Sequence, residues 1–342
     1  MVCSRVTRRW LHVLLWGVAT IAAVAVAFSW FAPSREYLYA PNRASPVGDK
    51  VKVEGERSGG GKGGAIYYVD VSVRPATWLE SVLPFLRPDG STLVPRDTVV
   101  PHGSSFEERR AEGLRAMALS EQTAAAVALK QAGYDVVVTP LGALVEGVAT
   151  DAPAAKVLHA GDVILEVGTT RTLTPNALRR SLDDVHPGDE VVLQIKRDRV
   201  MKTVTVRTID SPREPGHAVI GIRCTQAARI KLPLKVDIDL GAVGGPSAGL
   251  PFALDILQEL GTNVDHGKRV VATGEIGLDG SISPIGGVKQ KTYGARRAGA
   301  DVFLVPAGDN AAEARRYAGN LRIIPVKSFQ QALSALATAE AN

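Results

Sequence analysis

Cysteine and histidine are scarce in this sequence, which has two cysteines and six histidines among 342 residues. Neither C-x-x-C nor H-E-x-x-H occurs, so the usual ligand spacings of a zinc site are missing. Cys3 and Cys224 stand before and after a long apolar segment that we interpret as a membrane span, so we expect no disulfide between them. We therefore predict no metal and no cofactor.

The sequence also lacks a strong charge imbalance and a nucleotide-binding loop. Its formal net charge is +5, and no basic run is interleaved with aromatic residues, so we do not expect nucleic-acid binding. No G-x-x-x-x-G-K-[ST] motif occurs, because the lysine in "SGGGKGG" (58–64) is followed by glycine and the first glycine is misplaced. We therefore predict no ATP binding.

What the sequence does have is an almost unbroken apolar run from Trp10 to Phe31. At about 1.5 Å per helical residue, this run reaches roughly 33 Å, enough to cross a bilayer core. Three arginines precede it, which favours a cytoplasmic segment 1–9, a transmembrane anchor 10–31 and an extracytoplasmic body. A cleaved signal peptide is the competing interpretation, because "AVA" (25–27) fits a cleavage site. We favour the anchor, and both interpretations place the body outside the cytoplasm.

Residues 32–127 are predicted to form an N-terminal region of strands and helices. "AIYYVDVSV" (65–73) is typical of a strand, and residues 106–133 are rich in helix formers and end on a glycine. The segment 76–86, "ATWLESVLPFL", is apolar and contains a proline. It fits either a contact with a membrane surface or a packed short helix, and we favour the helix.

Residues 128–210 resemble a PDZ domain of the kind associated with bacterial proteases. The resemblance lies in "APAAKVLHAGDVILEVGTTRTLTPNALRRSL" (152–182), in which Thr174 is expected to cap a helix that begins at Pro175. The resemblance implies that a peptide is captured as an added strand. The groove would lie between the strand 143–148 and the helix 175–182, and its residues would be Leu141, Gly142, Ala143, Leu144 and Leu178.

The loop ahead of that strand, "PLGALV", matches the usual glycine–hydrophobic carboxylate loop only loosely. Binding of C-termini or of internal segments therefore stays open. A domain that only positions its neighbour is the alternative.

"GGPSAGL" (244–250) places Ser247 after a glycine-rich bend, at the start of a predicted helix. The first amides of a helix suit an oxyanion, so Ser247 and Ala248 are the predicted backbone donors. A capping serine in a glycine turn is the alternative. An α/β-hydrolase needs an acid and then a histidine after the serine. Only His266 follows Ser247, and no acid-then-histidine layout with room for further strands precedes it, so we do not expect that fold.

A serine–lysine dyad is the other enzymatic interpretation. A lysine can act as a base only when burial lowers its pKa from about 10.4 to roughly 7–8. Lys289 and Lys291 lie at the start of a glycine-flanked helix. Residues two apart on a helix diverge by about 200°, so only one of these lysines can face the serine.

Several motifs in order resemble the proteolytic domain of Lon-type proteases: the P-S-A-G serine, the T-G-E-I strand, a G-x-I-x-P-I-G-G hairpin and a K-x-K helix. The resemblance covers the domain predicted at 211–342. It implies that Ser247 is the nucleophile, that Lys291 is the general base and that Thr273 orients the lysine. Gly244 departs from the acid that Lon proteases with an ATPase often have there.

The complete layout is similar to the membrane-anchored PDZ–Lon-like proteases of Gram-positive bacteria. It implies an α/β (α+β) Lon-type domain preceded by a β-rich PDZ domain and an N-terminal transmembrane helix. We expect an ATP-independent serine endopeptidase that cleaves peptides or proteins outside the cytoplasmic membrane. We also expect single-pass membrane attachment and allow for a homo-oligomer. The rival interpretation is a catalytically silent, membrane-bound PDZ scaffold.

Overall fold

The computed structural model describes residues 16–17, 19–20, 32–55, 64–100, 105–212 and 214–338. The predicted anchor, 10–31, lies outside the described residues except for four of them. Within the described ranges, no helix combines the length and the apolar character that crossing a bilayer requires. The anchor therefore stays a prediction.

Five strands form the central sheet, in the order β2-β4-β16-β19-β20. Their bounds are Ser45–Pro46, Ala65–Tyr68, Arg269–Ala272, Val302–Pro306 and Arg322–Val326, respectively. All neighbouring pairs are parallel except β2 with β4. A parallel sheet is covered on both faces, which explains why β19, "VFLVP", is buried along its whole length.

The central sheet joins two regions that the sequence analysis treats as separate domains. β4 comes from the region predicted at 32–127, yet it pairs with β16 of the region predicted at 211–342. A second pair joins the same two regions, because β3 (Val51–Val53) pairs with β15 (Val236–Ile238). The two regions therefore form one folding unit. A short apolar strand such as "AIYY" shows its own conformation in the sequence but not its partner, so this pairing was not predictable.

The two faces of this sheet pack against different helices. Val270 and Ala272 belong to a core that includes α6 (Gly249–Glu259) and α9 (Phe329–Thr338). Val271, between them, belongs to a second core with α7 (Val288–Arg297) and α8 (Asp309–Tyr317). Because side chains alternate along a strand, α6 and α7 cover opposite faces of the sheet.

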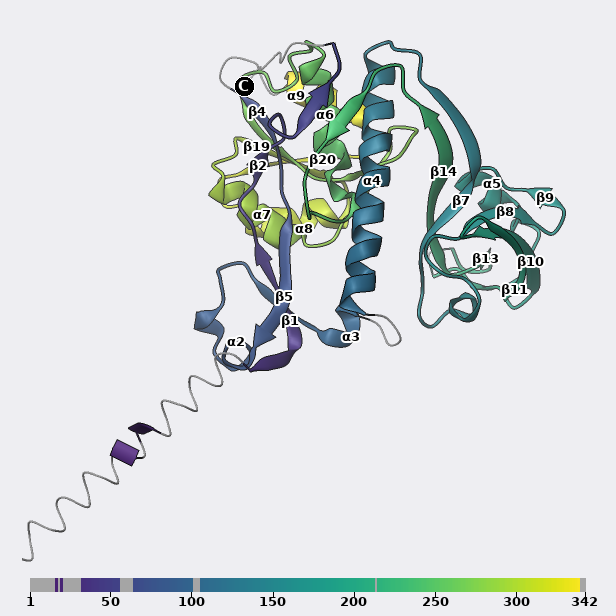
Figure 1. Cartoon of the computed structure of the whole chain (residues 1–342), viewed down its shortest axis with the longest axis horizontal. Helices are drawn as coiled ribbons and strands as arrows, with labels where there is room; N and C mark the ends of the chain where they lie inside the picture. The colour runs from purple at the N-terminus through teal and green to yellow at the C-terminus, as the bar shows by residue number, and fades with distance from the viewer. Residues whose placement is uncertain are drawn as a thin grey trace, which may run out of the picture.

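Helix α4 (Phe106–Gln131) packs along α6 and joins the central sheet to the rest of the chain (Figure 1). Ser105 and Glu108 form a capping box at its start, and Gly133, with φ of +88°, follows its end. Several of its buried side chains are alanines, among them Ala124 and Ala128, which lets its backbone pack close to α6.

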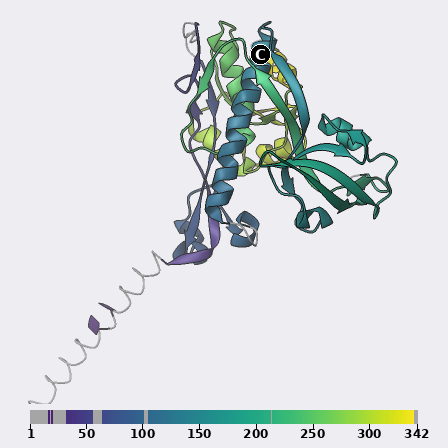
Figure 2. The same ribbon diagram turned by 45° about the vertical axis from the view of Figure 1, so that its right-hand side comes forward.

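The second sheet has the order β11-β10-β8-β7-β14, and β9 pairs with β8. In chain order, β7 to β11 and β14 span Val137–Val148, Val163–Val167, Thr170–Arg171, Glu190–Arg197, Val200–Arg207 and Ile222–Lys231. Helix α5 (Pro175–Arg180) and the 3-10 turn η2 (Pro153–Lys156) complete this unit, which has its own core. The predicted Thr174 cap is confirmed by its hydrogen bond to the Ala177 amide. Figure 2 shows this unit as a lobe beside the central sheet.

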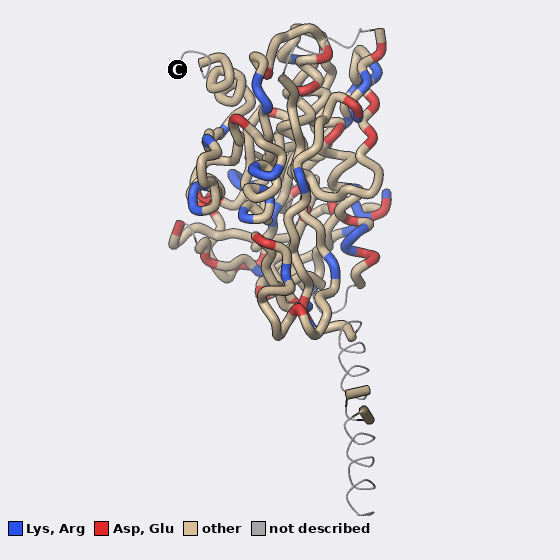
Figure 3. Tube along the Cα trace, turned by 90° about the vertical axis from the view of Figure 1, so that its left-hand side faces the viewer, with Lys and Arg blue, Asp and Glu red and all other residues tan. Residues whose placement is uncertain are grey.

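A third, three-stranded sheet of order β5-β1-β6 forms one end of the molecule (Figure 1). Its strands are β1 (Pro33–Pro41), β5 (Val71–Thr77) and β6 (Thr92–Pro95), with α2 (Trp78–Val82), η1 (Pro84–Leu86) and α3 (Arg96–Val99) around them. Two short pairs are β12 (Ile209–Asp210) with β13 (Ala218–Val219), and β17 (Glu275–Ile276) with β18 (Ile282–Ser283). Basic and acidic residues are both spread over the face in Figure 3.

We predict that a fragment of residues 211–342 does not fold alone, whereas 32–342 does. The short fragment lacks β4 and α4, and the uncovered apolar surface outweighs a domain's net stability of about 5–15 kcal/mol. Thermal melts followed by circular dichroism should give a cooperative transition for 32–342 only. A cooperative transition in 211–342 would contradict the shared core.

Candidate active site

Ser247 lies in the 3-10 turn η3 (Pro246–Ala248), immediately before α6. Gly245 precedes this turn with φ of +97°, a conformation that favours glycine. The first amides of a helical turn have no acceptor within the helix, so the N–H groups of Ser247 and Ala248 can serve a ligand. Their part in holding an oxyanion stays a prediction.

Lys291 projects from α7 and is only 4% exposed. Its Nζ donates to Ser247 Oγ at 2.7 Å and to Thr273 Oγ1 at 3.0 Å. Thr273 Oγ1 in turn donates to the Ser247 carbonyl oxygen at 3.1 Å. The structure therefore brings together the three side chains that the sequence singled out.

These three residues meet at the carboxyl end of β16. Ser247 precedes a helix on one face of the sheet, Lys291 lies on a helix of the other face, and Thr273 follows β16 directly. The backbone closes the arrangement, because the amide of Gly274 donates to the Ser247 carbonyl at 2.8 Å. The strand end is where helices from both faces can approach each other, as in other open α/β sheets.

Burial lowers the pKa of Lys291 from its ordinary value to about 7, and the carboxylate of Asp70 opposes this shift. A buried amine is deprived of water, which disfavours its charged form. Near neutral pH, a large fraction of Lys291 is therefore the free amine. Such an amine can accept the proton of a hydroxyl that lies 2.7 Å away.

Lys289 points elsewhere, as the two-residue spacing predicts. Its Nζ donates to the Ser91 carbonyl at 3.0 Å and to Thr92 Oγ1 at 3.3 Å. It also lies 5.6 Å from the ring centre of Tyr317. Lys289 is half-buried and links α7 to the loop before β6.

Helix α4 supports the loop that carries Ser247 through two hydrogen bonds. The Gly245 amide donates to the Gly113 carbonyl at 2.8 Å, and Ser120 Oγ donates to the Pro246 carbonyl at 3.0 Å. A Cβ on Gly244 would lie 3.1 Å from the Gly113 carbonyl carbon. Glycine at 244 therefore lets α4 pass close by. Sequence reasoning missed Gly113 and Ser120, because no local pattern links them to a loop more than a hundred residues away.

Asp255 and Asp265, the two aspartates between Ser247 and His266 in the sequence, take part in other interactions. Asp265 accepts from the Gly267 amide at 2.7 Å and from the Gln258 side chain. Burial raises the pKa of Asp255 to about 8, and three further carboxylates add to the shift. The side chain that donates a hydrogen bond to Ser247 Oγ is that of Lys291.

The predicted peptide groove beside the strand 143–148 is wrong. β7 is an inner strand: Ala143 and Leu144 pair with β8 on one side, and β14 pairs along β7 on the other. Ala143 is fully buried, and Leu178 joins it in the same core. A Cβ at Gly142 would meet the Ile164 carbonyl at 2.5 Å. Of the predicted groove residues, only Leu141 is largely exposed.

The strand that ends this sheet beside α5 is β14. Gln226 on β14 donates to the carbonyl of Leu173, which lies just before the helix, at 2.8 Å. Gly221, with φ of +79°, precedes β14 and is flanked by Ile220 and Ile222. This glycine–hydrophobic triplet was the signal that could have identified the strand. The triplet lies within the range 211–342 that the sequence analysis gives to the following domain.

The two lobes touch close to the pair formed by Ser247 and Lys291. Glu275 follows Thr273 by two residues, and its pKa is raised to about 8 by burial and by Glu146 on β7. Arg223 on β14 opposes that shift and donates to Glu146 at 3.1 Å. The second sheet therefore contacts the same segment that orients Lys291.

Two family models match the chain. Residues 225–338 match the C-terminal proteolytic domain of Lon protease (S16), and residues 116–208 match the PDZ domain. The chain therefore contains both domains, and the PDZ match begins within α4 rather than at the predicted residue 128.

Curated relatives include a Lon protease of Roseiflexus castenholzii (strain DSM 13941 / HLO8), 32% identical over 139 residues, which are 38% of this chain and 16% of that protein. Lon protease 2 of Bacillus subtilis (strain 168) is 36% identical over 91 residues, which are 27% of this chain and 16% of that protein. The chain thus matches a small part of each relative. The crystal structure of the PDZ domain of an SdrC-like protein from Listeria monocytogenes is 28% identical, with a TM-score of 0.24, and the match covers 25% of this chain and 90% of that one. The Lon relatives support a serine peptidase.

We predict that kcat/KM for a peptide rises with pH through about 7 and then levels off. The neutral amine of Lys291 accumulates above its pKa, so the rate falls about tenfold per pH unit below it. Because the pKa of Lys291 is lowered in the folded state, its contribution to the free energy of unfolding depends on pH. This contribution rises between about pH 7 and about pH 10.4 and is constant below pH 7. Unfolding linked to this lysine therefore cannot explain a fall of kcat/KM below pH 7. A pH–rate profile with its midpoint near 10 would contradict a buried base.

We predict that Ser120→Ala lowers kcat severalfold without moving the pH midpoint. It leaves the Pro246 carbonyl without its donor and loosens the loop before Ser247, at a stability cost of about 1–3 kcal/mol. The matched control is Thr123→Val, one turn along α4, which removes a hydroxyl that bonds only within the helix. Equal kcat losses in both variants, measured on folded protein, would indicate a general effect on α4.

Proposed function

We propose that this chain is a serine endopeptidase that works through a dyad of Ser247 and Lys291. The observation that carries the proposal is the 2.7 Å contact between Ser247 Oγ and a buried lysine amine whose pKa is about 7. The match to the proteolytic domain of Lon protease supports the reaction class. Both the hydroxyl and its base stand next to helix-start amides that could receive a carbonyl oxygen.

In the proposed reaction, neutral Lys291 takes the proton of Ser247 as Oγ attacks the scissile carbonyl carbon. The amides of Ser247 and Ala248 hold the oxyanion. The C–N bond then breaks, and the lysine ammonium gives its proton to the leaving amine. Water attacks the acyl-enzyme with Lys291 again as base, which releases the new carboxyl end and restores the serine. Thr273 keeps the amine in place through its own hydroxyl.

For the PDZ domain, we propose recruitment of extended substrate segments. Within the described residues β14 ends the strand order of its sheet, so an added strand would pair with the outer edge of β14, beside α5. The contact of Glu146 and Arg223 with the segment of Glu275 would bring a recruited chain close to the dyad.

We propose that this activity takes place outside the cytoplasmic membrane and does not require ATP. The apolar run 10–31 with its basic flank supports the location, and the missing phosphate-binding motif in the 342 residues supports independence from ATP. The rival, a silent PDZ scaffold, would not need a lysine buried against a serine.

Labelling with a peptide phosphonate tests the dyad. We expect the full chain to be labelled at Ser247 and to cleave an unstructured protein, and Ser247→Ala and Lys291→Ala to lose both activities by at least about three orders of magnitude. Adding ATP should leave the rate unchanged.

Lys289→Gln is the matched control, because it changes a lysine on the same helix that bonds to Ser91 and Thr92 instead of Ser247. It should keep nearly full activity once folding is verified by circular dichroism. Normal cleavage by Lys291→Ala would rule out the dyad, and absence of any labelling or cleavage in the wild-type chain would favour the scaffold.

A further inference from the structure

The segment α2–η1 carries three large apolar side chains on the outside of the molecule. Phe85 is 79% exposed, Val82 52% and Trp78 50%. Trp78 and Val82 are four residues apart in α2 and therefore share one face of the helix. We call these three residues the apolar platform. Large exposed apolar groups that cluster in this way usually mark a contact surface.

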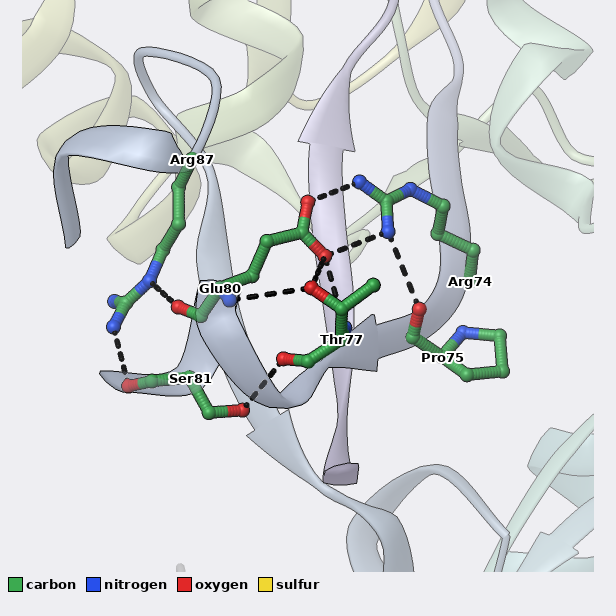
Figure 4. A network of polar contacts seen from close by, with 6 residues as sticks. All are labelled: Arg74, Pro75, Thr77, Glu80, Ser81 and Arg87. Atoms are coloured by element: carbon green, nitrogen blue, oxygen red, sulfur yellow. Dashed lines mark hydrogen bonds and ion pairs between the residues drawn. The ribbon is translucent and has the colours of Figure 1, made fainter. Parts of the chain in front are cut away.

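A network of polar contacts holds the segment that carries the apolar platform (Figure 4). Thr77 and Glu80 form a capping box at the start of α2, and the Arg74 guanidinium pairs with both carboxylate oxygens of Glu80. This pairing lowers the pKa of Glu80 to about 2, so the carboxylate stays charged. Arg87 binds the carbonyls of Glu80 and Ser81 from the other side. The segment thus has its polar groups satisfied internally while its apolar ones face outward.

The apolar platform lies where the predicted anchor would join the folded body. The apolar run ends at Phe31 and β1 begins at Pro33, so Ala32 alone separates them. Consecutive Cα atoms are about 3.8 Å apart, which leaves no room for a spacer. The Ala32 carbonyl accepts from the Trp78 amide at 2.8 Å. Figure 1 shows α2 and the start of β1 at the same end of the molecule.

We propose that the apolar platform inserts into the interfacial layer of the lipid bilayer and fixes the orientation of the body on the membrane. The inference rests on the anchor of the proposed function, but not on its proteolytic activity. Tryptophan and phenylalanine beside a span suit the boundary between acyl chains and headgroups. Because the anchor already holds the platform near the surface, even a weak contact is occupied most of the time.

The charges around the apolar platform agree with a lipid partner. The network beneath it contains two guanidinium groups and one carboxylate, so basic groups outnumber acidic ones within that network. The side chain of Arg74 is 44% exposed and that of Glu80 only 12%, so the basic partner is the one that faces outward.

Spin labelling of the full chain in phosphatidylglycerol–phosphatidylcholine vesicles tests the docking. Cys3 and Cys224 are replaced by serine, and one label is attached through Phe85→Cys. The matched control is Met201→Cys on β11, an apolar residue of the PDZ lobe that is 56% exposed. For each label we measure the ratio of its collision rate with oxygen to its collision rate with a nickel chelate. We expect this ratio to be severalfold higher at 85 than at 201. The double change Trp78→Asp and Val82→Asp should return the label at 85 to aqueous behaviour.

Each outcome decides the proposal. A vesicle-bound chain whose label at 85 behaves like that at 201 overturns the docking and leaves the anchor intact. A chain that does not float with vesicles overturns the docking together with the anchor. Dipolar coupling between labels at 85 on two copies would assign the apolar platform to a protein interface and also overturn the proposal. Phosphonate labelling of the same samples reports the dyad independently, so its failure is distinguishable.

Discussion

The burial of one amine, that of Lys291, is the constraint on which the arrangement of the site depends. An ammonium group placed there loses its hydration, and the cost is met only because the residue can exist as a neutral amine near pH 7. Burial requires cover from both sides of the sheet. Helix α7 brings the lysine from one face, α6 brings the serine from the other, and β16 ends between them with Thr273 as the third partner. The hydroxyl of Thr273 holds the lysine without adding a charge that would raise its pKa again.

Much of the site was predictable because it is encoded in short motifs. The order of the serine, the T-G-E strand and the K-x-K helix carried the resemblance, and the geometry at Ser247, Thr273 and Lys291 agrees with it. The divergence of Lys289 from Lys291 followed from helix geometry alone. These features involve residues within one helix or close to strand ends, where local sequence determines the direction of a side chain.

What the sequence could not predict are partners that lie far apart along the chain. β4 pairs with a strand two hundred residues later, α4 supports the serine loop through a main-chain carbonyl, and β14 belongs to the sheet of the preceding lobe. Each of these segments has the composition expected of a strand or a helix, and nothing in that composition names the partner. The groove prediction failed for the same reason, because alternation along β7 cannot tell an edge strand from an inner one. The glycine at 244 is likewise explained by a distant partner, because a Cβ there would lie too close to the backbone of Gly113.

In the sequence, the PDZ lobe lies between the segments that form the two halves of the central unit. This order affects when each part can fold during synthesis. A ribosome delivers β4 and α4 first, then the whole PDZ lobe, and only afterwards β16, α7 and their neighbours. The PDZ lobe has a core of its own and can close as soon as β14 has emerged, whereas β4 and α4 must wait for more than a hundred residues. Lys291 is among the last parts of the site to be made. The pair formed by Ser247 and Lys291 can therefore assemble only after α7 has been made.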